Sequence, residues 1–304
     1  MTPVEYRGKR PIGNGWQHRV IDAGNIAQYF NDTQLNIGVV LGPTSHNLTD
    51  VDEDADVAIR IGPYILPQTK ARFGRASKRD SHRLYYTDLS ATDRPATIAF
   101  DDPRKPKQQG RLIELRIGGN SGAQSVLPGS VHKSGETVAW EEDGAPATVD
   151  GDDLLQRVRT VAAYSLLARY WPAEGSGHHD TARVVGGLLA RIGLSPAIVR
   201  IHVEAITRAA NSPRWKELSA LLRMRLKPLL PASTPSALMG CVKPSALTSP
   251  RRFASGSTIK ARKKTILLMQ PRPGMIRIFL FGMIAVASCR ISRSMFSPRL
   301  GKSG

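Results

Sequence analysis

The sequence predicts an α+β fold, because the period of its apolar residues changes part-way along the chain. In the first half the apolar residues form short strand-like runs separated by turns rich in Gly and Pro. From Asp152 they recur about every 3.6 positions, as in amphipathic helices. We therefore expect a sheet-containing domain over residues 1–148, a small all-α unit over residues 151–217, and an irregular basic tail over residues 218–304.

Charge is distributed unevenly along the chain. The 304 residues include 43 Lys and Arg against 25 Asp and Glu, a net charge of +18, which taken alone suggests nucleic-acid binding. The last acidic residue is Glu217, and 16 of the basic residues follow it. Residues 1–217 thus carry 27 basic and 25 acidic residues and are nearly neutral, so the high charge belongs to the basic tail.

Two hypotheses account for the basic tail, which lacks Asp and Glu and shows no sustained helical or strand period. One is a disordered arm that binds nucleic acid electrostatically. The other is translation out of the natural reading frame, after a frameshift inside the fourth expected helix, which Ser212-Pro213 starts. The absence of acidic residues, together with the enrichment of Met and Cys, favours the frameshift.

Cysteine usage and hydropathy indicate a cytoplasmic protein. Both cysteines, Cys241 and Cys289, lie in the basic tail, so residues 1–217 offer no disulfide framework and no thiolate metal site. The first residues lack the apolar core of a signal peptide. The most apolar run, residues 278–289, is about half of the ~20 residues that span a bilayer. We expect no membrane association.

Several elements are expected before residue 118. Residues 9–16 form a turn-rich opening, and residues 36–41 read as a buried strand. Residues 55–66 allow a helix, which Gly62-Pro63 is expected to end. Residues 111–117 form the clearest strand, because their apolar side chains alternate with charged ones.

Helices are expected throughout residues 151–217. An apolar stripe defines the first of them, and Gly193 closes the second. The first helix is expected to start at Asp152, and the second is expected to follow Asp180 as its cap. The third and fourth are expected to start at Ser195-Pro196 and Ser212-Pro213.

An acidic stretch, residues 47–54, follows the first strand. An extended chain would place Asp50, Asp52 and Asp54 on one face. Neighbouring carboxylates repel one another unless a cation lies among them, and Mg²⁺ takes oxygen ligands such as paired carboxylates. An acidic run taken alone is more often a solvated turn, so later segments have to decide between the two.

Two later segments offer partners for such a site. Residues 70–79 are basic and lead into His82, which we expect at the head of a strand. They are either a solvated loop or a clamp for phosphates, in which an imidazole donates to a phosphate oxygen. On the strand 111–117, Glu114 and Arg116 share a face. They are either an exposed pair or a metal carboxylate beside a phosphate-binding guanidinium.

Taken together, these segments resemble the N-terminal domain of bifunctional DNA primase/polymerases, the prim-pol branch of the archaeo-eukaryotic primase superfamily. The resemblance covers roughly residues 7–145 and rests on the order of its segments. These are Lys9–Trp16, Asn36–Val39, Asp50–Asp52, Arg72–Lys78, Ser81-His82, Ile113–Arg116 and Val126–Gly135. It implies a catalytic domain with an RRM-like sheet. The helices after it look like those that often follow this domain in phage and prophage replication proteins.

The resemblance also implies roles by position. The catalytic residues are expected to be Asp50, Asp52, His82 and Glu114. The metal ligands are expected among Asp50, Asp52, Asp54 and Glu114, because the register of the acidic motif is ambiguous. The nucleotide-binding residues are expected to be Arg75, Lys78, Ser81, His82, Arg116, Ser130 and His132. Implied cofactors and substrates are Mg²⁺ or Mn²⁺, a DNA template with its primer, and dNTPs or NTPs.

The implied activity is template-directed nucleotidyl transfer by a two-metal mechanism, with the ions about 4 Å apart and basic residues positioning the triphosphate. In related replication proteins a helicase-type ATPase commonly comes next. This chain contains no GxxxxGK[ST] loop, so a separate ATPase is an expected partner. Two alternatives stay open: an inactive nucleic-acid-binding prophage remnant, and a metal-dependent nuclease. Binding of dNTP by residues 70–82 would distinguish a polymerase from a nuclease.

Overall fold

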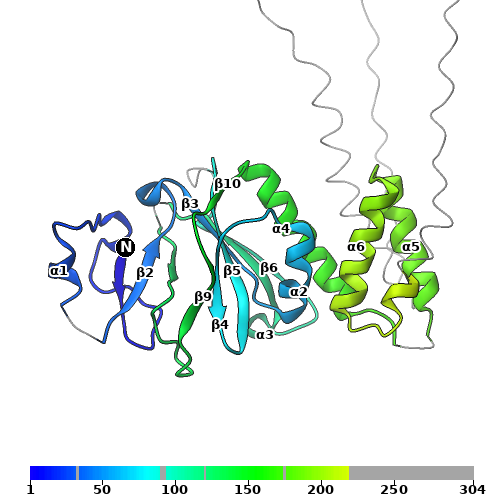
Figure 1. The fold of residues 1–304 in the computed structure, drawn as a ribbon, viewed down its shortest axis with the longest axis horizontal. Helices are drawn as coiled ribbons and strands as arrows, with labels where there is room; N and C mark the ends of the chain where they lie inside the picture. The colour runs from blue at the N-terminus through cyan, green and yellow to red at the C-terminus, as the bar shows by residue number, and fades with distance from the viewer. Residues whose placement is uncertain (32–33, 90–93, 120, 174–175, 219–304) are drawn as a thin grey trace, which may run out of the picture. The chain divides into compact units, whose positions relative to one another are not determined.

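The fold is built on two β-sheets with helices packed beside the larger one (Figure 1). The computed structural model describes residues 1–31, 34–89, 94–119, 121–173 and 176–218. These residues belong to one compact unit. Strands dominate up to residue 148 and helices follow, so the predicted α+β class is confirmed.

Within the described residues the larger sheet has seven strands and the smaller sheet three. The larger sheet has the order β6-β7-β3-β5-β4-β9, with β10 pairing in parallel to β5, and the smaller has the order β1-β2-β8. The larger sheet comprises β3 Leu48–Asp52, β4 Ala71–Arg75, β5 Lys78–Tyr86, β6 Thr97–Asp101, β7 Arg111–Arg116, β9 Val138–Asp143 and β10 Ala147–Thr148. The smaller comprises β1 Thr2–Val4, β2 Asn36–Val40 and β8 Gln124–Val126.

The helices lie between and after the strands. They are α1 Ile26–Tyr29, α2 Asp56–Ile65, α3 Lys107–Gly110, α4 Gly151–Arg169, α5 His178–Arg191 and α6 Pro196–Ala209, with 3-10 turns at Trp16–His18 and Pro43–Ser45. The first predicted helix of the C-terminal unit, α4, packs against both α2 and β7. It therefore covers the sheet as well as contacting α6.

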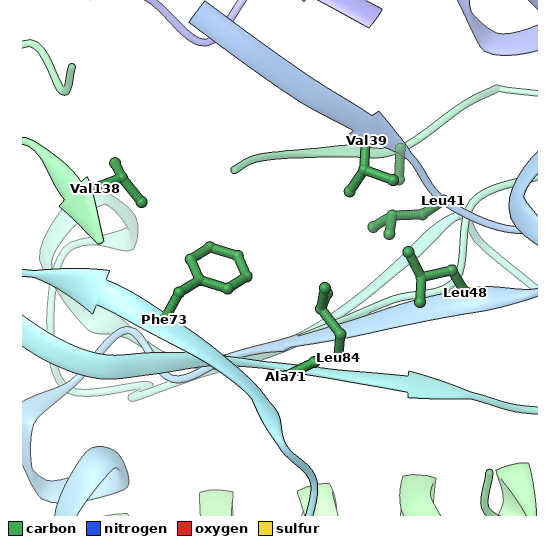
Figure 2. Close-up of a cluster of buried hydrophobic side chains, with 8 residues drawn as sticks. Val39, Leu41, Leu48, Ala71, Phe73, Leu84 and Val138 are labelled. Carbon is green, nitrogen blue, oxygen red and sulfur yellow. The ribbon is translucent and has the colours of Figure 1, made fainter. Parts of the chain in front are cut away.

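The two faces of the larger sheet are covered differently. Helices α2 and α4 cover one face, where Val51, Ile113 and Leu115 are fully buried. The smaller sheet lies over part of the other face (Figure 1). Between the sheets is an apolar cluster, drawn in Figure 2, in which side chains of the smaller sheet face those of the larger. Its members are Val39, Leu41, Leu48, Ala71, Phe73, Leu84, Ala123 and Val138. This cluster holds the smaller sheet against the larger sheet, next to the polar side chains that lie on the same face of the larger sheet.

The register of the larger sheet determines which polar side chains meet. Strand β3 lies between β5 and β7, and Asp52 is opposite His82 on β5 and Glu114 on β7. On the same strand Asp50 is opposite Arg116. Residues that are opposite in neighbouring strands point to the same face, so all of these side chains lie on the face that the smaller sheet partly covers.

The prediction that Gly62-Pro63 ends a helix was wrong, because α2 continues to Ile65 with Pro63 inside it. Pro63 has no amide hydrogen to donate to the Ile59 carbonyl, so the helix continues with the loss of that one intrahelical hydrogen bond. The Leu66 amide still donates to the Gly62 carbonyl. Gly62 has a packing role instead, since a Cβ at this position would clash with the Glu53 carboxylate.

Two other expected boundaries were wrong. Helix α5 begins at His178, where Gly177 at φ 98° turns the chain into the helix, and Asp180 lies in the first turn without capping it. Residues 70–79 form the β4–β5 hairpin, so His82 lies within β5 and not at its head. The predicted Ser195 cap of α6 is confirmed, because its side chain accepts from the Ile198 amide.

The last predicted elements reach the limit of the described residues. Residues 215–218 are helical, close to the start expected at Ser212-Pro213. Apart from residue 218, the predictions for the basic tail, its cysteines and residues 278–289 lie outside the described residues. Among the described helices, none has the length and apolar character needed to cross a membrane.

Candidate active site

The acidic cluster consists of Asp52, Asp54 and Glu114, whose carboxylate oxygens come within 4.8 Å of one another. Asp52 and Glu114 are opposite each other on β3 and β7, and Asp54 follows the end of β3. Asp52 is buried and its Oδ1 has no hydrogen-bond partner. Hard divalent cations bind carboxylate oxygens, and a buried carboxylate oxygen without a hydrogen-bond partner is available as a ligand. These residues therefore fit the metal that the sequence implied.

Asp50 lies on the same face but outside the acidic cluster. Its side chain is fully buried. Its Oδ2 accepts a hydrogen bond from the Ser125 hydroxyl of β8 and lies 3.0 Å from His82 Nδ1. Its Oδ1, like that of Asp52, is buried and has no hydrogen-bond partner. The acidic cluster therefore comprises Asp52, Asp54 and Glu114, while Asp50 contacts the imidazole, and the metal role predicted for Asp50 stays a prediction. Nothing in the local sequence indicated the contact with Ser125, which is 75 positions away.

His82 is held on both sides. Its ring stacks on Phe73 with centroids 4.6 Å apart and an interplanar angle of 4°. Nδ1 contacts Asp50, and Nε2 lies 3.7 Å from Asp52 Oδ1. Burial opposes protonation, but the charges of Asp52 and Asp50 outweigh it and raise the pKa of His82 above its ordinary value. This environment favours a positively charged ring beside the acidic cluster.

Basic side chains neutralise the acidic cluster. Arg116 pairs with Asp52, and its Nε lies 2.9 Å from Glu114 Oε2. Lys78 Nζ is 3.2 Å from Asp54 Oδ1. Burial opposes ionisation of Asp52, but His82, Arg116 and Lys78 lower its pKa well below the ordinary range. Asp52 is therefore ionised at neutral pH and ready to bind a cation.

An open pocket lies beside the acidic cluster, and it gathers most of the predicted nucleotide-binding residues. Its lining includes Arg75, Ser81, His82, Arg116 and His132. The strands β4, β5 and β7 supply the first four, so one sheet carries both this lining and the acidic cluster.

Two predicted nucleotide-binding residues do not line the pocket. Lys78 contacts the acidic cluster instead. Ser130 is buried, and its hydroxyl accepts a hydrogen bond of 2.9 Å from the Ile37 amide. The structure thus gives Ser130 a contact with β2 in place of the predicted position at the pocket.

Sequence reasoning missed two polar side chains that line the pocket, those of Lys9 and Gln124. They are joined, because Gln124 Nε2 donates to the Lys9 carbonyl oxygen over 2.7 Å. Lys9 belongs to one of the segments that carried the family resemblance, so a signal was present for it. For Gln124 the sequence offered none.

An ion network on the helix-covered face was also missed. Glu53 follows β3, and its Oε2 lies 2.8 Å from the Nε of Arg83, with the two side chains 0% and 2% exposed. Arg83 also pairs with Asp80, which in turn pairs with Arg72. The Glu53 amide donates to the Ser81 carbonyl. The network therefore anchors the segment that carries Asp52 and Asp54.

Fold and site together define a mixed α+β domain in which a cluster of carboxylates adjoins a pocket lined with basic residues. Residues 1–151 match the family model described as "Bifunctional DNA primase/polymerase, N-terminal" (Prim-Pol), and this part of the chain belongs to that family. No curated protein matches the chain. Membership implies nucleotidyltransferase chemistry that uses nucleotides, nucleic acid and divalent metal ions.

Proposed function

We propose that this protein is a DNA primase/polymerase that adds nucleotides to a primer end under the direction of a template. The observation that carries the proposal is the acidic cluster beside a pocket lined with basic residues on the same sheet face. A divalent ion pair, Mg²⁺ or Mn²⁺, activates a 3′-hydroxyl and neutralises phosphate charge when bound.

The residues divide this work between them. Asp52, Asp54 and Glu114 hold the metal ions. His82, oriented by Asp50, donates to a phosphate oxygen from the pocket side. Arg75 and Arg116 add positive charge along the pocket wall, as positioning of a triphosphate requires. Asp50 is thereby a positioning residue and not a ligand.

The wider organisation follows from the family resemblance. We assign the catalytic domain, with its RRM-like sheet, to residues 1–148 and the helical unit to residues 151–217. The packing of α4 on β7 makes that unit continuous with the catalytic sheet. We assign the protein to cytoplasmic replication of phage or prophage type. Its partners are DNA, dNTPs or NTPs, and a helicase-type ATPase supplied by another chain.

Primer extension by the full chain with Mg²⁺ or Mn²⁺ tests the proposal. Asp52→Asn should reduce incorporation by about 10³-fold, because it removes charge stabilisation of the transition state. It should also weaken Mn²⁺ binding measured without nucleotide. The matched control is Asp153→Asn, whose exposed carboxylate pairs with Arg157 on α4, and it should leave both measurements unchanged.

The same assay distinguishes the alternatives. Degradation of the labelled strand without nucleotide incorporation would identify a metal-dependent nuclease. DNA binding with neither activity would identify an inactive remnant. Incorporation that persists in Asp52→Asn would refute the assignment of the acidic cluster.

A further inference from the structure

The positive side chains that sequence reasoning assigned to the nucleotide are already paired with carboxylates. Arg75 Nε lies 3.1 Å from Glu136 Oε2, and Lys78 Nζ lies 3.2 Å from Asp54 Oδ1. Arg116 pairs with Asp52 and Glu114. A cation that already has an anionic partner contributes less net charge to an incoming phosphate.

Lys9 differs from these side chains. It lines the same pocket. Among the described residues, its ammonium makes no ion pair and no side-chain hydrogen bond. Removal from water lowers the pKa of Lys9, and the charges that act on it most are those of Asp52 and Arg116. Lys9 therefore brings an uncommitted positive charge close to the acidic cluster.

The backbone around Lys9 is well anchored. The Lys9 carbonyl accepts from Gln124 of β8, and the Glu5 amide donates to the Arg10 carbonyl over 3.0 Å. A β-bridge joins Val4 to Pro11 on either side of this loop. An ammonium presented from a fixed loop loses less conformational freedom when it binds a ligand. The smaller sheet thus positions Lys9 across the pocket from the larger sheet.

We propose that Lys9 binds the phosphate groups of the incoming nucleoside triphosphate from the side of the smaller sheet. The inference rests on the proposed function, because that function supplies the triphosphate. It assigns the smaller sheet a part in substrate binding, in addition to its packing through the apolar cluster. Lys9 adds an unpaired positive charge to those of Arg75 and Arg116, which carboxylates partly compensate.

Equilibrium binding of dATP and of deoxyadenosine to the full chain, in the presence of Mg²⁺, tests the proposal. Lys9→Gln should weaken dATP binding by roughly 10- to 100-fold, the usual range for a charged hydrogen bond. Deoxyadenosine has no phosphate, so its binding should not change. Lys9→Arg should retain most of the dATP affinity. The neighbouring control Arg10→Gln should bind dATP as the wild type does, because Arg10 does not line this pocket.

Steady-state primer extension adds a readout that a purely structural role would not move. Lys9→Gln should raise the KM for dNTP and leave kcat within about threefold of the wild-type value. This pattern is expected when the lost contact stabilises the bound substrate and the transition state equally. Wild-type affinity for dATP in Lys9→Gln would overturn the inference alone. An equal loss of dATP and deoxyadenosine binding would also overturn it, because it would indicate a distorted pocket. A wild-type protein that binds no dATP would overturn both the inference and the proposed function.

Discussion

Removing Arg83 tests whether the buried ion network stabilises the fold. Arg83 lies on β5, and its guanidinium is the main partner of the Glu53 carboxylate, which is 0% exposed. Arg83→Met preserves most of the side-chain volume but leaves Glu53 buried without its counter-charge. Burial raises the pKa of Glu53 to about 7 even beside Arg83, so without Arg83 the Glu53 carboxyl takes up a proton at neutral pH. The cost of breaking a buried pair, about 3–5 kcal/mol, is therefore the upper bound that we expect for Arg83→Met.

A neighbouring arginine provides the comparison. Arg79 is on the same strand, and its NH2 lies 2.6 Å from Glu141 Oε2, close to the 2.8 Å of the Arg83–Glu53 pair. The Arg79 side chain is 72% exposed, and solvent screens exposed pairs so that they contribute little to stability. The two pairs have similar distances, so burial, together with the second pair that Arg83 makes with Asp80, predicts a larger loss of stability for Arg83→Met than for Arg79→Met.

Urea unfolding of the full chain, followed by tryptophan fluorescence and far-UV circular dichroism, measures both variants. The double variant Glu53→Gln/Arg83→Met should recover part of the loss, because no unpaired charge remains. Equal midpoints for Arg83→Met and Arg79→Met would refute the reasoning from burial. A double variant as unstable as Arg83→Met would show that lost packing, and not the isolated charge, causes the effect.

Two further predictions use the same unfolding assay. Gly62→Ala should destabilise the protein by about 1–3 kcal/mol, because the new methyl group overpacks against Glu53. Gly187→Ala should stabilise it by about 0.5–1 kcal/mol, because a Cβ there meets nothing within 4 Å. A change of the same sign in both variants would contradict the packing argument. Burial, aided by the charge of Arg157, lowers the pKa of His202 from 6.5 to about 4. Between pH 6.5 and about 4, His202 therefore binds a proton in the unfolded chain but not in the folded chain. The free energy of unfolding should fall as the pH decreases through this range. His202→Gln should remove this part of the pH dependence, and an unchanged dependence would assign it to another group.

Local patterns predicted the elements better than they predicted the site. Alternation correctly placed Glu114 and Arg116 on one face of β7, because side-chain direction in a strand depends only on position. The pairing of Asp52 with both His82 and Glu114 could not be derived in this way. It depends on the register between strands that are distant in sequence, and the packing of the apolar cluster helps to fix that register.

The ambiguity between Asp50 and Asp54 has the same physical origin. The sequence placed Asp50, Asp52 and Asp54 on one face as equal candidates. In the structure the strand ends at Asp52, and Asp54 still reaches the acidic cluster. The Ser125 hydroxyl and the His82 ring engage Asp50 instead. Both neighbours come from other strands, so no pattern within residues 47–54 could have shown which of these carboxylates join the acidic cluster.

The acidic stretch is best understood as two sites that share one segment of backbone. Asp52 and Asp54 belong to the acidic cluster, whereas Glu53 between them pairs with Arg83 on the helix-covered face. A residue in an extended chain points opposite to its two neighbours, so an anchor at Glu53 constrains both metal carboxylates at once. The clash that a side chain at position 62 would cause shows how closely α2 fits around that anchor. The spacing of the candidate ligands therefore depends on the core beneath them. Sequence reasoning grouped only Asp50, Asp52 and Asp54 on one face and gave Glu53 no role.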